Sequence, residues 1–83
     1  MFIRKKRLEN GWTQSHVAEK LEVSERFYRS IEAGHKKPSY ENIIKIEDLF
    51  NLPQRVLFCE DVHKLPDIYK PFINLNFLIQ KQV

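Results

Sequence analysis

Hydrophobic residues recur with helical spacing along the first two thirds of the chain and predict five short helices. Residues that end or start helices lie between them, including the Asn10-Gly11 step, Gly34 and Pro53. The predicted helices cover residues 2–10, 14–21, 25–33, 40–50 and 53–58. The pattern therefore indicates an all-α domain.

The second and third predicted helices are joined by a tight turn and divide most clearly into two faces. In residues 14–21 the apolar face consists of Val17, Ala18 and Leu21. In residues 25–33, steps of 100° per residue place four side chains inside, Phe27, Tyr28, Ile31 and Glu32, and four outside, Glu25, Arg26, Arg29 and Ser30. Two short helices with arginines on the outer face of the second have the geometry that places one helix in the DNA major groove.

Local signals support the helix boundaries. Side chains that can cap a helix stand directly before three of the predicted helices, at Thr13, Ser24 and Ser39. In the first helix we expect an inward stripe of Ile3, Arg7 and Leu8, and we expect Trp12 to pack beneath the second helix.

The last segment, residues 60–83, is apolar but shows no single period. A helical spacing connects Ile68, Phe72, Leu75 and Ile79, whereas Ile73, Leu75, Phe77 and Ile79 alternate as in a strand. Because so apolar a segment is unfavourable in water, we expect it to pack on its own domain or on a second copy. We therefore divide the chain into a DNA-binding domain, residues 1–59, and a C-terminal extension, residues 60–83. The extension is expected to contribute a dimer interface through Ile68, Phe72, Leu75 and Ile79.

Length and charge fit this division. The 83 residues suit one domain with one modest core. The net charge is +3, and its surplus lies with the helix pair: residues 1–37 carry nine Lys/Arg and five Asp/Glu, whereas residues 38–83 carry five and six. This distribution suits a surface that faces phosphate, although ordinary solvated charge would give the same surplus.

Cysteine content and missing motifs exclude several protein classes. The single cysteine, Cys59, excludes a disulfide framework and is typical of a protein in a reducing cytoplasm. No apolar run is long enough to span a membrane. We predict neither catalysis nor a cofactor, because the chain lacks a Gly-rich phosphate loop and a nucleophile elbow. Its histidines, His16, His35 and His63, lack the spacing of metal ligands, so no metal site is expected.

Six motifs follow one another along residues 3–58: Ile3-Arg4-Lys5-Lys6-Arg7, Gly11-Trp12-Thr13-Gln14, Val17-Ala18-Glu19-Lys20-Leu21, Val23-Ser24, Ile31-Glu32-Ala33-Gly34 and Lys37-Pro38-Ser39. In this order they resemble the lambda-repressor-like, or Cro-and-repressor, family of helix-turn-helix transcription regulators. Several motifs in the correct order are more specific than one helix-turn-helix pattern. The resemblance implies a five-helix DNA-binding domain and leaves residues 60–83 outside it.

The resemblance also implies which side chains contact base edges. Glu25, Arg26 and Ser30 match the positions that read bases, and Arg29 lies on the same arc. Arg26 is the first candidate, because an arginine fork fits guanine O6 and N7. Glu25 could accept a hydrogen bond from a cytosine amino group or could repel phosphate, and Arg29 could contact phosphate instead of a base.

Phosphate contacts are implied at five other positions. Gln14 begins the second helix, where its family counterpart binds a phosphate and braces the recognition helix; a plain helix-start residue is the alternative. Further contacts are expected in the loop after the third helix and at the start of the fourth, from Lys36, Lys37, Tyr40 and Asn42.

Arg7 and Glu32 match a family pair that joins the first helix to the third by a salt bridge, which implies a structural role. Two positions depart from the family. Glu22 stands in the turn where the family usually has glycine, and a left-handed glutamate costs roughly 1–2 kcal/mol. Tyr28 replaces a smaller aliphatic residue, so its ring needs more room and its hydroxyl needs a partner.

We therefore predict a sequence-specific transcription regulator that acts as a repressor. It would bind double-stranded DNA as a homodimer, on a palindromic operator with half-sites about 34 Å apart. Two other functions fit the same residues. One is an antitoxin that represses its own operon and holds a toxin through its tail. The other is a protein-interaction module on the same fold without specific DNA binding. A regulatory protein partner is compatible with each of them.

Overall fold

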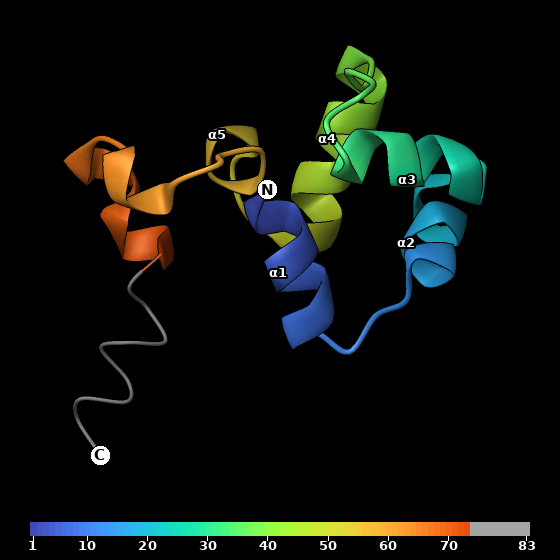
Figure 1. The fold of residues 1–83 in the computed structure, drawn as a ribbon, viewed down its shortest axis with the longest axis horizontal. Coiled ribbons are helices and arrows are strands. Elements are labelled where there is room, and N and C mark those ends of the chain that lie inside the picture. Colours follow the sequence, from blue (N-terminus) through green and yellow to red (C-terminus); the bar gives the residue numbers. More distant parts are fainter. Residues whose placement is uncertain (74–83) are drawn as a thin grey trace.

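The computed structural model describes residues 1–73, and their regular structure is entirely helical (Figure 1). The α-helices in chain order are α1 (Phe2–Glu9), α2 (Gln14–Leu21), α3 (Glu25–Glu32), α4 (Tyr40–Phe50) and α5 (Gln54–Leu57). Two 3-10 helices follow, η1 (Val62–Lys64) and η2 (Asp67–Tyr69), and residues 70–73 are again α-helical. The predicted five-helix, all-α domain is confirmed, with each helix within one or two residues of its expected bounds.

Side-chain caps fix the starts of three helices where the sequence placed them. The Thr13 hydroxyl accepts a hydrogen bond from the His16 backbone N–H at 2.9 Å, at the start of α2. Ser24 does the same for the Phe27 N–H at 3.0 Å, and Ser39 for the Asn42 N–H at 3.2 Å. Each cap provides a partner for an N–H group that the helix itself leaves unbonded.

The core lies between α1, the α2–α3 pair, α4 and α5. Its buried cluster consists of Ile3, Val17, Ala18, Leu21, Tyr28, Ile46, Phe50 and Leu57. α2 and α3 pack against each other, and Ile31 of α3 is also buried. The Trp12 ring meets Phe50 of α4 edge-on, with 5.4 Å between ring centroids, and its centroid lies 5.7 Å from that of the His16 ring of α2.

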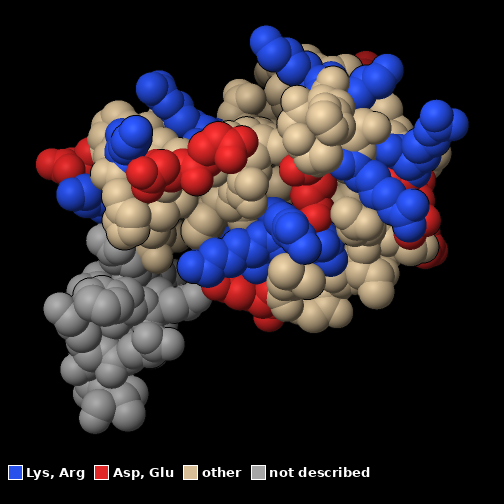
Figure 2. Space-filling view, viewed as in Figure 1, with Lys and Arg blue, Asp and Glu red and all other residues tan. Residues whose placement is uncertain are grey.

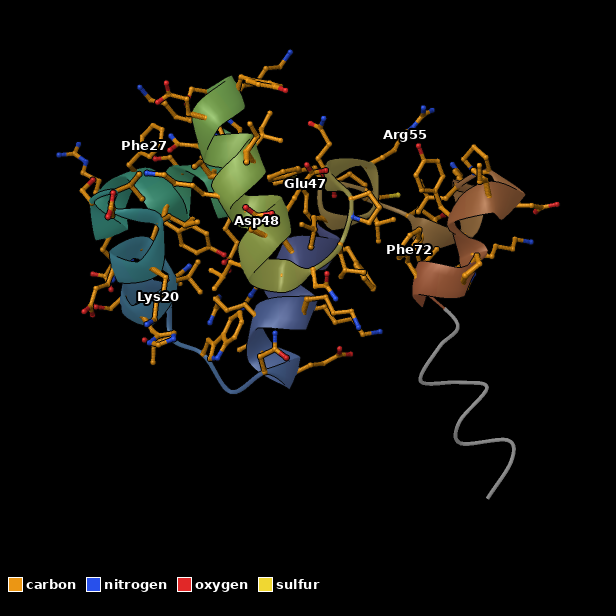
Figure 3. The ribbon with its side chains drawn as sticks, turned by 180° about the vertical axis from the view of Figure 1, so that it is seen from behind. Lys20, Phe27, Glu47, Asp48, Arg55 and Phe72 are labelled. Atoms are coloured by element: carbon orange, nitrogen blue, oxygen red, sulfur yellow. The ribbon has the colours of Figure 1, made fainter. Side chains whose placement is uncertain are left out.

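Two expected inward positions differ in the structure. Leu8 was expected in the stripe of the first helix, but 57% of it is exposed, because the inner face of α1 passes through Phe2, Ile3 and Arg7 instead. Phe27, on α3, is only half-buried (Figure 3). The burial of a side chain at the margin of a helical face depends on which neighbouring elements cover it, and the hydrophobic period does not specify those neighbours.

The extension forms an arm beside α5 (Figure 1). The Arg55 guanidinium lies 5.8 Å from the centre of the Tyr69 ring, and Phe72 lines a hollow with Phe50 and Leu52 (Figure 3). Residues 67–73 are helical, whereas most positions of the two periods that the sequence left open lie outside the described residues. Ile68 and Phe72 remain exposed, whereas Leu75 and Ile79 lie outside the described residues.

Candidate nucleic-acid interface

The turn between α2 and α3 has a left-handed residue at the position where the family prefers glycine. Glu22 has φ 60° and ψ 40°, and it ends α2. The Val23 N–H then donates to the Ala18 carbonyl at 3.0 Å, which closes the turn. The Glu22 carboxylate accepts a hydrogen bond from Lys45 of α4 at 3.3 Å. The chain thus keeps the turn without glycine, and it does so at the cost of left-handed strain.

The outer face of α3 carries the four side chains that the sequence singled out. Arg26 and Arg29 are exposed, whereas Glu25 and Ser30 are half-buried. The Ser30 hydroxyl donates to the Arg26 carbonyl within the helix at 3.1 Å, so it has only its lone pairs left for a ligand. Within residues 1–73, no ion pair engages Arg26, which leaves its guanidinium available.

The same end of the molecule is rich in basic side chains. Lys and Arg gather over α3 and the upper end of α4 (Figure 2). The loop after α3 is tied to that helix, because the His35 and Lys36 N–H groups both bond the Ser30 carbonyl, at 2.9 and 3.2 Å. Lys36 and Lys37 are exposed on this loop. A surface of this kind attracts phosphate without reading sequence.

The start of α4 follows this loop directly. Tyr40 is 77% exposed, and Asn42 is half-buried beside it. The Asn42 backbone N–H is already engaged in the Ser39 cap, so any contact from Asn42 to a phosphate must come from its side chain. Both residues therefore lie where the sequence analysis expected them, next to the basic loop.

Gln14, the first residue of α2, connects the outer face of α3 to the interior. Its Oε1 accepts from Arg29 Nε at 3.2 Å, and its Nε2 donates to Glu32 Oε1 at 3.4 Å. Arg29 also donates to the Glu25 carboxylate from Nη2, at 3.1 Å. The resemblance implied that Gln14 braces the recognition helix, but sequence reasoning did not identify its partners Arg29 and Glu32 or the bond between Arg29 and Glu25. The i,i+4 spacing of Glu25 and Arg29 was a usable signal, but nothing local connects Gln14 to Arg29.

A buried ion pair lies beneath this surface. Arg7 Nε and Nη2 each donate to a different oxygen of Glu32, both at 2.9 Å, and Arg7 Nη1 donates to the Trp12 carbonyl at 2.8 Å. Both side chains are buried. Burial opposes the ionisation of Glu32, but the hydrogen bonds and charge of Arg7 outweigh it and hold the pKa of this carboxyl below its ordinary value. The salt bridge that the resemblance implied is therefore present.

Tyr28 is fully buried in the core, next to this pair. Its hydroxyl has no hydrogen-bond partner among the described residues, contrary to the expectation that it would find one. Burial raises the pKa of Tyr28 far above its ordinary value, because a phenolate would be poorly solvated there. The Glu32 carboxylate nearby also opposes ionisation of this hydroxyl, although the two groups lack the geometry of a hydrogen bond.

Residues 1–73 contain neither a cluster of metal-binding side chains nor a membrane-spanning helix. No three His, Cys, Asp or Glu side chains come together there as a metal site would require. None of the helices in that range combines the length and the apolar character that crossing a membrane demands.

Comparisons with known proteins agree with this geometry. A protein-family model described as helix-turn-helix matches residues 3–53, which is more than half of the chain. The uncharacterized HTH-type transcriptional regulator YqaF of Bacillus subtilis (strain 168) is 36% identical over 61 residues, which span 74% of this chain and 79% of YqaF. Among solved structures, a chain of the SinR protein/SinI protein complex is similar with a TM-score of 0.63 and 23% identity. That match covers 93% of this chain and 79% of the other, and at this identity it concerns the fold.

Proposed function

Because the chain belongs to the lambda-repressor-like helix-turn-helix family of DNA-binding transcription regulators, we propose that it represses transcription by binding a palindromic operator as a homodimer. The recognition helix in this proposal is α3, which enters the major groove. The observation that carries it is the outer face of α3, where the exposed Arg26 guanidinium is free of ion pairs within residues 1–73.

Arg26 is proposed to read a guanine. A bidentate arginine contact to O6 and N7 needs two free N–H groups and an unobstructed approach. Its exposure on the outer face supports both requirements. Ser30, with only lone pairs to offer, would accept from a base amino group.

Five side chains are proposed to hold the phosphate backbone on either side of α3. Gln14 would do so from the start of α2, where free backbone N–H groups also favour an anion. On the other side the contacts would come from Lys36, Lys37, Tyr40 and Asn42. Such contacts set the register of α3 in the groove and supply most of the salt-dependent affinity.

The homodimer is proposed to form through the C-terminal extension, residues 60–83. Ile68 is 76% exposed and Phe72 is 40% exposed, which is unfavourable for apolar side chains in water unless a partner covers them. We expect Ile68→Ser with Phe72→Ser to weaken the dimer, as measured by sedimentation of the full chain. Ile44→Ser is the matched control, because Ile44 is 42% exposed on a different surface, α4. A dimer unchanged by the double substitution would contradict this interface.

The test of the function is selection of bound sequences from a random DNA pool at physiological salt, with the full chain. Recovery of an inverted repeat, with half-sites about 34 Å apart, would support an operator-binding dimer. Recovery of no consensus, with binding that vanishes as salt rises, would contradict it and favour the protein-interaction module.

A protein partner is a second candidate function. The similar solved structure is a complex of SinR with SinI. In this chain, the exposed Ile68 and Phe72 offer an apolar surface to another protein. An antitoxin would use the same surface to hold its toxin. Co-purification of a defined partner that the Ile68→Ser, Phe72→Ser variant loses would support this reading over self-association.

A further inference from the structure

We propose that Glu25 and Arg29 act as one unit that reads a single C·G base pair. In this unit Glu25 accepts from the cytosine amino group while Arg29 donates to the guanine of the same pair. The inference rests on the proposed DNA-binding function and specifies which base pair α3 recognises beyond the contact assigned to Arg26.

The two side chains form an exposed, ordered pair. Arg29 Nη2 lies 3.1 Å from Glu25 Oε2, and the two residues stand one helical turn apart on the outer face of α3. Their side chains are 59% and 42% exposed, so a ligand can reach both. Arg29 is also held from behind, because its Nε donates to Gln14 Oε1 at 3.2 Å.

The pair keeps free hydrogen-bonding groups of both kinds. A guanidinium has five N–H donors, of which the bonds to Gln14 and Glu25 use two. Three remain on Nη1 and Nη2, which is enough for a two-donor contact. On Glu25, the described hydrogen bonds engage Oε2, whereas Oε1 accepts none within residues 1–73. The unit thus presents donors directly beside an acceptor.

Only one kind of base pair matches that order in the major groove. Across a G·C pair the groove shows two adjacent acceptors, guanine N7 and O6, followed by one donor, the cytosine amino group. An A·T pair shows acceptor, donor, acceptor and then a methyl group. Arg29 offers two adjacent donors and Glu25 offers an acceptor beside them. This order complements a G·C pair and does not complement an A·T pair.

Gln14 could contact a DNA phosphate while its side chain holds Arg29 in position. Its amide nitrogen carries two hydrogens, and the bond to Glu32 uses one of them. The second can reach a phosphate without releasing Arg29, whose bond goes to the amide oxygen. A phosphate held by Gln14 would therefore fix the position of the residue that braces Arg29.

The charges of Glu25 and Arg29 allow base recognition to be distinguished from electrostatic attraction to phosphate. Glu25 neutralises Arg29, so together they attract phosphate weakly, and non-specific affinity must come from other cations of this surface. If Glu25 only repelled phosphate, its removal would strengthen binding to every sequence alike. If it reads cytosine, its removal changes the preferred base at one position.

The experiment is selection from a random DNA pool with the full chain and with Glu25→Gln and Arg29→Gln. Competition binding follows on the selected site and on the same site with the assigned C·G pair changed to T·A. Glu9→Gln is the matched control, because Glu9 pairs with Lys6 at the same 3.1 Å, on α1 and outside the surfaces proposed for DNA and for the dimer. Helicity of each variant is checked by circular dichroism.

We expect the wild type and Glu9→Gln to prefer C·G over T·A at one position by roughly 5- to 150-fold, and both α3 variants to lose that preference. Two results would overturn the inference: variants that retain the same C·G preference, and a Glu25→Gln variant that binds all sequences more tightly while keeping the wild-type consensus. If the wild type selects no consensus sequence, the result would instead contradict the proposed operator-binding function.

Discussion

Arg7 and Glu32 hold α1 against α3 through two parallel hydrogen bonds of 2.9 Å, from Nε to Oε2 and from Nη2 to Oε1. The pair lies 25 residues apart in sequence and is buried beneath the surface proposed to face DNA. Glu32 also accepts from Gln14, which in turn accepts from Arg29. One buried carboxylate therefore supports both the attachment of α3 and the orientation of a side chain on its outer face.

Removing one partner of this pair should destabilise the fold strongly. Arg7→Met leaves the Glu32 carboxylate buried without its partner, and we expect a loss of about 3–5 kcal/mol in the free energy of unfolding. Urea denaturation measures it. The control is Arg4→Met, because Arg4 lies 4.0 Å from Glu32 but is 69% exposed, and its loss should cost under about 1 kcal/mol. Equal losses for the two variants would contradict the assigned role of Arg7.

The same pair should make stability depend on acid pH. The pKa of Glu32 is lowered in the folded protein, whereas in the unfolded chain it should be ordinary, about 4.3. Its stabilisation is therefore complete above that pH and is lost as pH falls toward the lowered folded value. As pH falls below about 5, we expect the free energy of unfolding to decrease more steeply for the wild type than for Glu32→Gln. If the free energy of unfolding of the two proteins changed with pH at the same rate, Glu32 would not be the source of the acid dependence.

Glycine at position 22 should stabilise the protein. Glu22 is left-handed, at φ 60°, and glycine adopts that conformation without steric cost. The exposed contact with Lys45 is worth at most about 1 kcal/mol, so we expect Glu22→Gly to raise the free energy of unfolding by about 0.5–1 kcal/mol. Asn51→Gly is the matched control. Asn51 has nearly the same left-handed geometry, φ 56°, but asparagine tolerates it, so the gain there should be smaller.

Removing the Tyr28 hydroxyl should not harm the fold. The group is buried without a partner among the described residues, and leaving such a group unbonded costs roughly 1–3 kcal/mol. We expect Tyr28→Phe to raise the thermal midpoint, with a gain of about 1 kcal/mol. Tyr40→Phe, at an exposed position, should change nothing. A Tyr28→Phe variant that unfolds more easily would mean that the hydroxyl does form a stabilising bond.

Arg26 and Lys36 should contribute to DNA binding in different ways. Arg26→Ala is expected to cost about 1–3 kcal/mol on the selected operator and to relax specificity at one position. Lys36→Ala should weaken binding on all sequences by a similar factor and lower the slope of affinity against salt by about one. Fluorescence anisotropy titrations on operator and scrambled DNA at several salt concentrations distinguish them. If the two variants had identical salt slopes and base preferences, the assignment of Arg26 to a base and Lys36 to phosphate would be contradicted.

Much of the fold could be predicted because its signals are local. Helical spacing of apolar residues, three capping side chains and the glycines between helices specify where each helix begins and ends. The outward positions of Glu25, Arg26, Arg29 and Ser30 follow from the angle per residue alone. The Arg7–Glu32 pair was not visible in any local pattern, and only the family resemblance indicated it.

Other features depend on contacts between segments far apart in the chain. The exposure of Leu8, the unbonded Tyr28 hydroxyl and the bond from Arg29 to Gln14 are all set by how α1, α2 and α3 pack together. The sequence by itself determined the helices, their caps and the two faces of α3, because each of these follows from neighbours within about one helical turn. Only the tertiary structure decided which polar groups of different helices meet, because hydrogen bonding requires distances and angles that close packing of several helices sets at once.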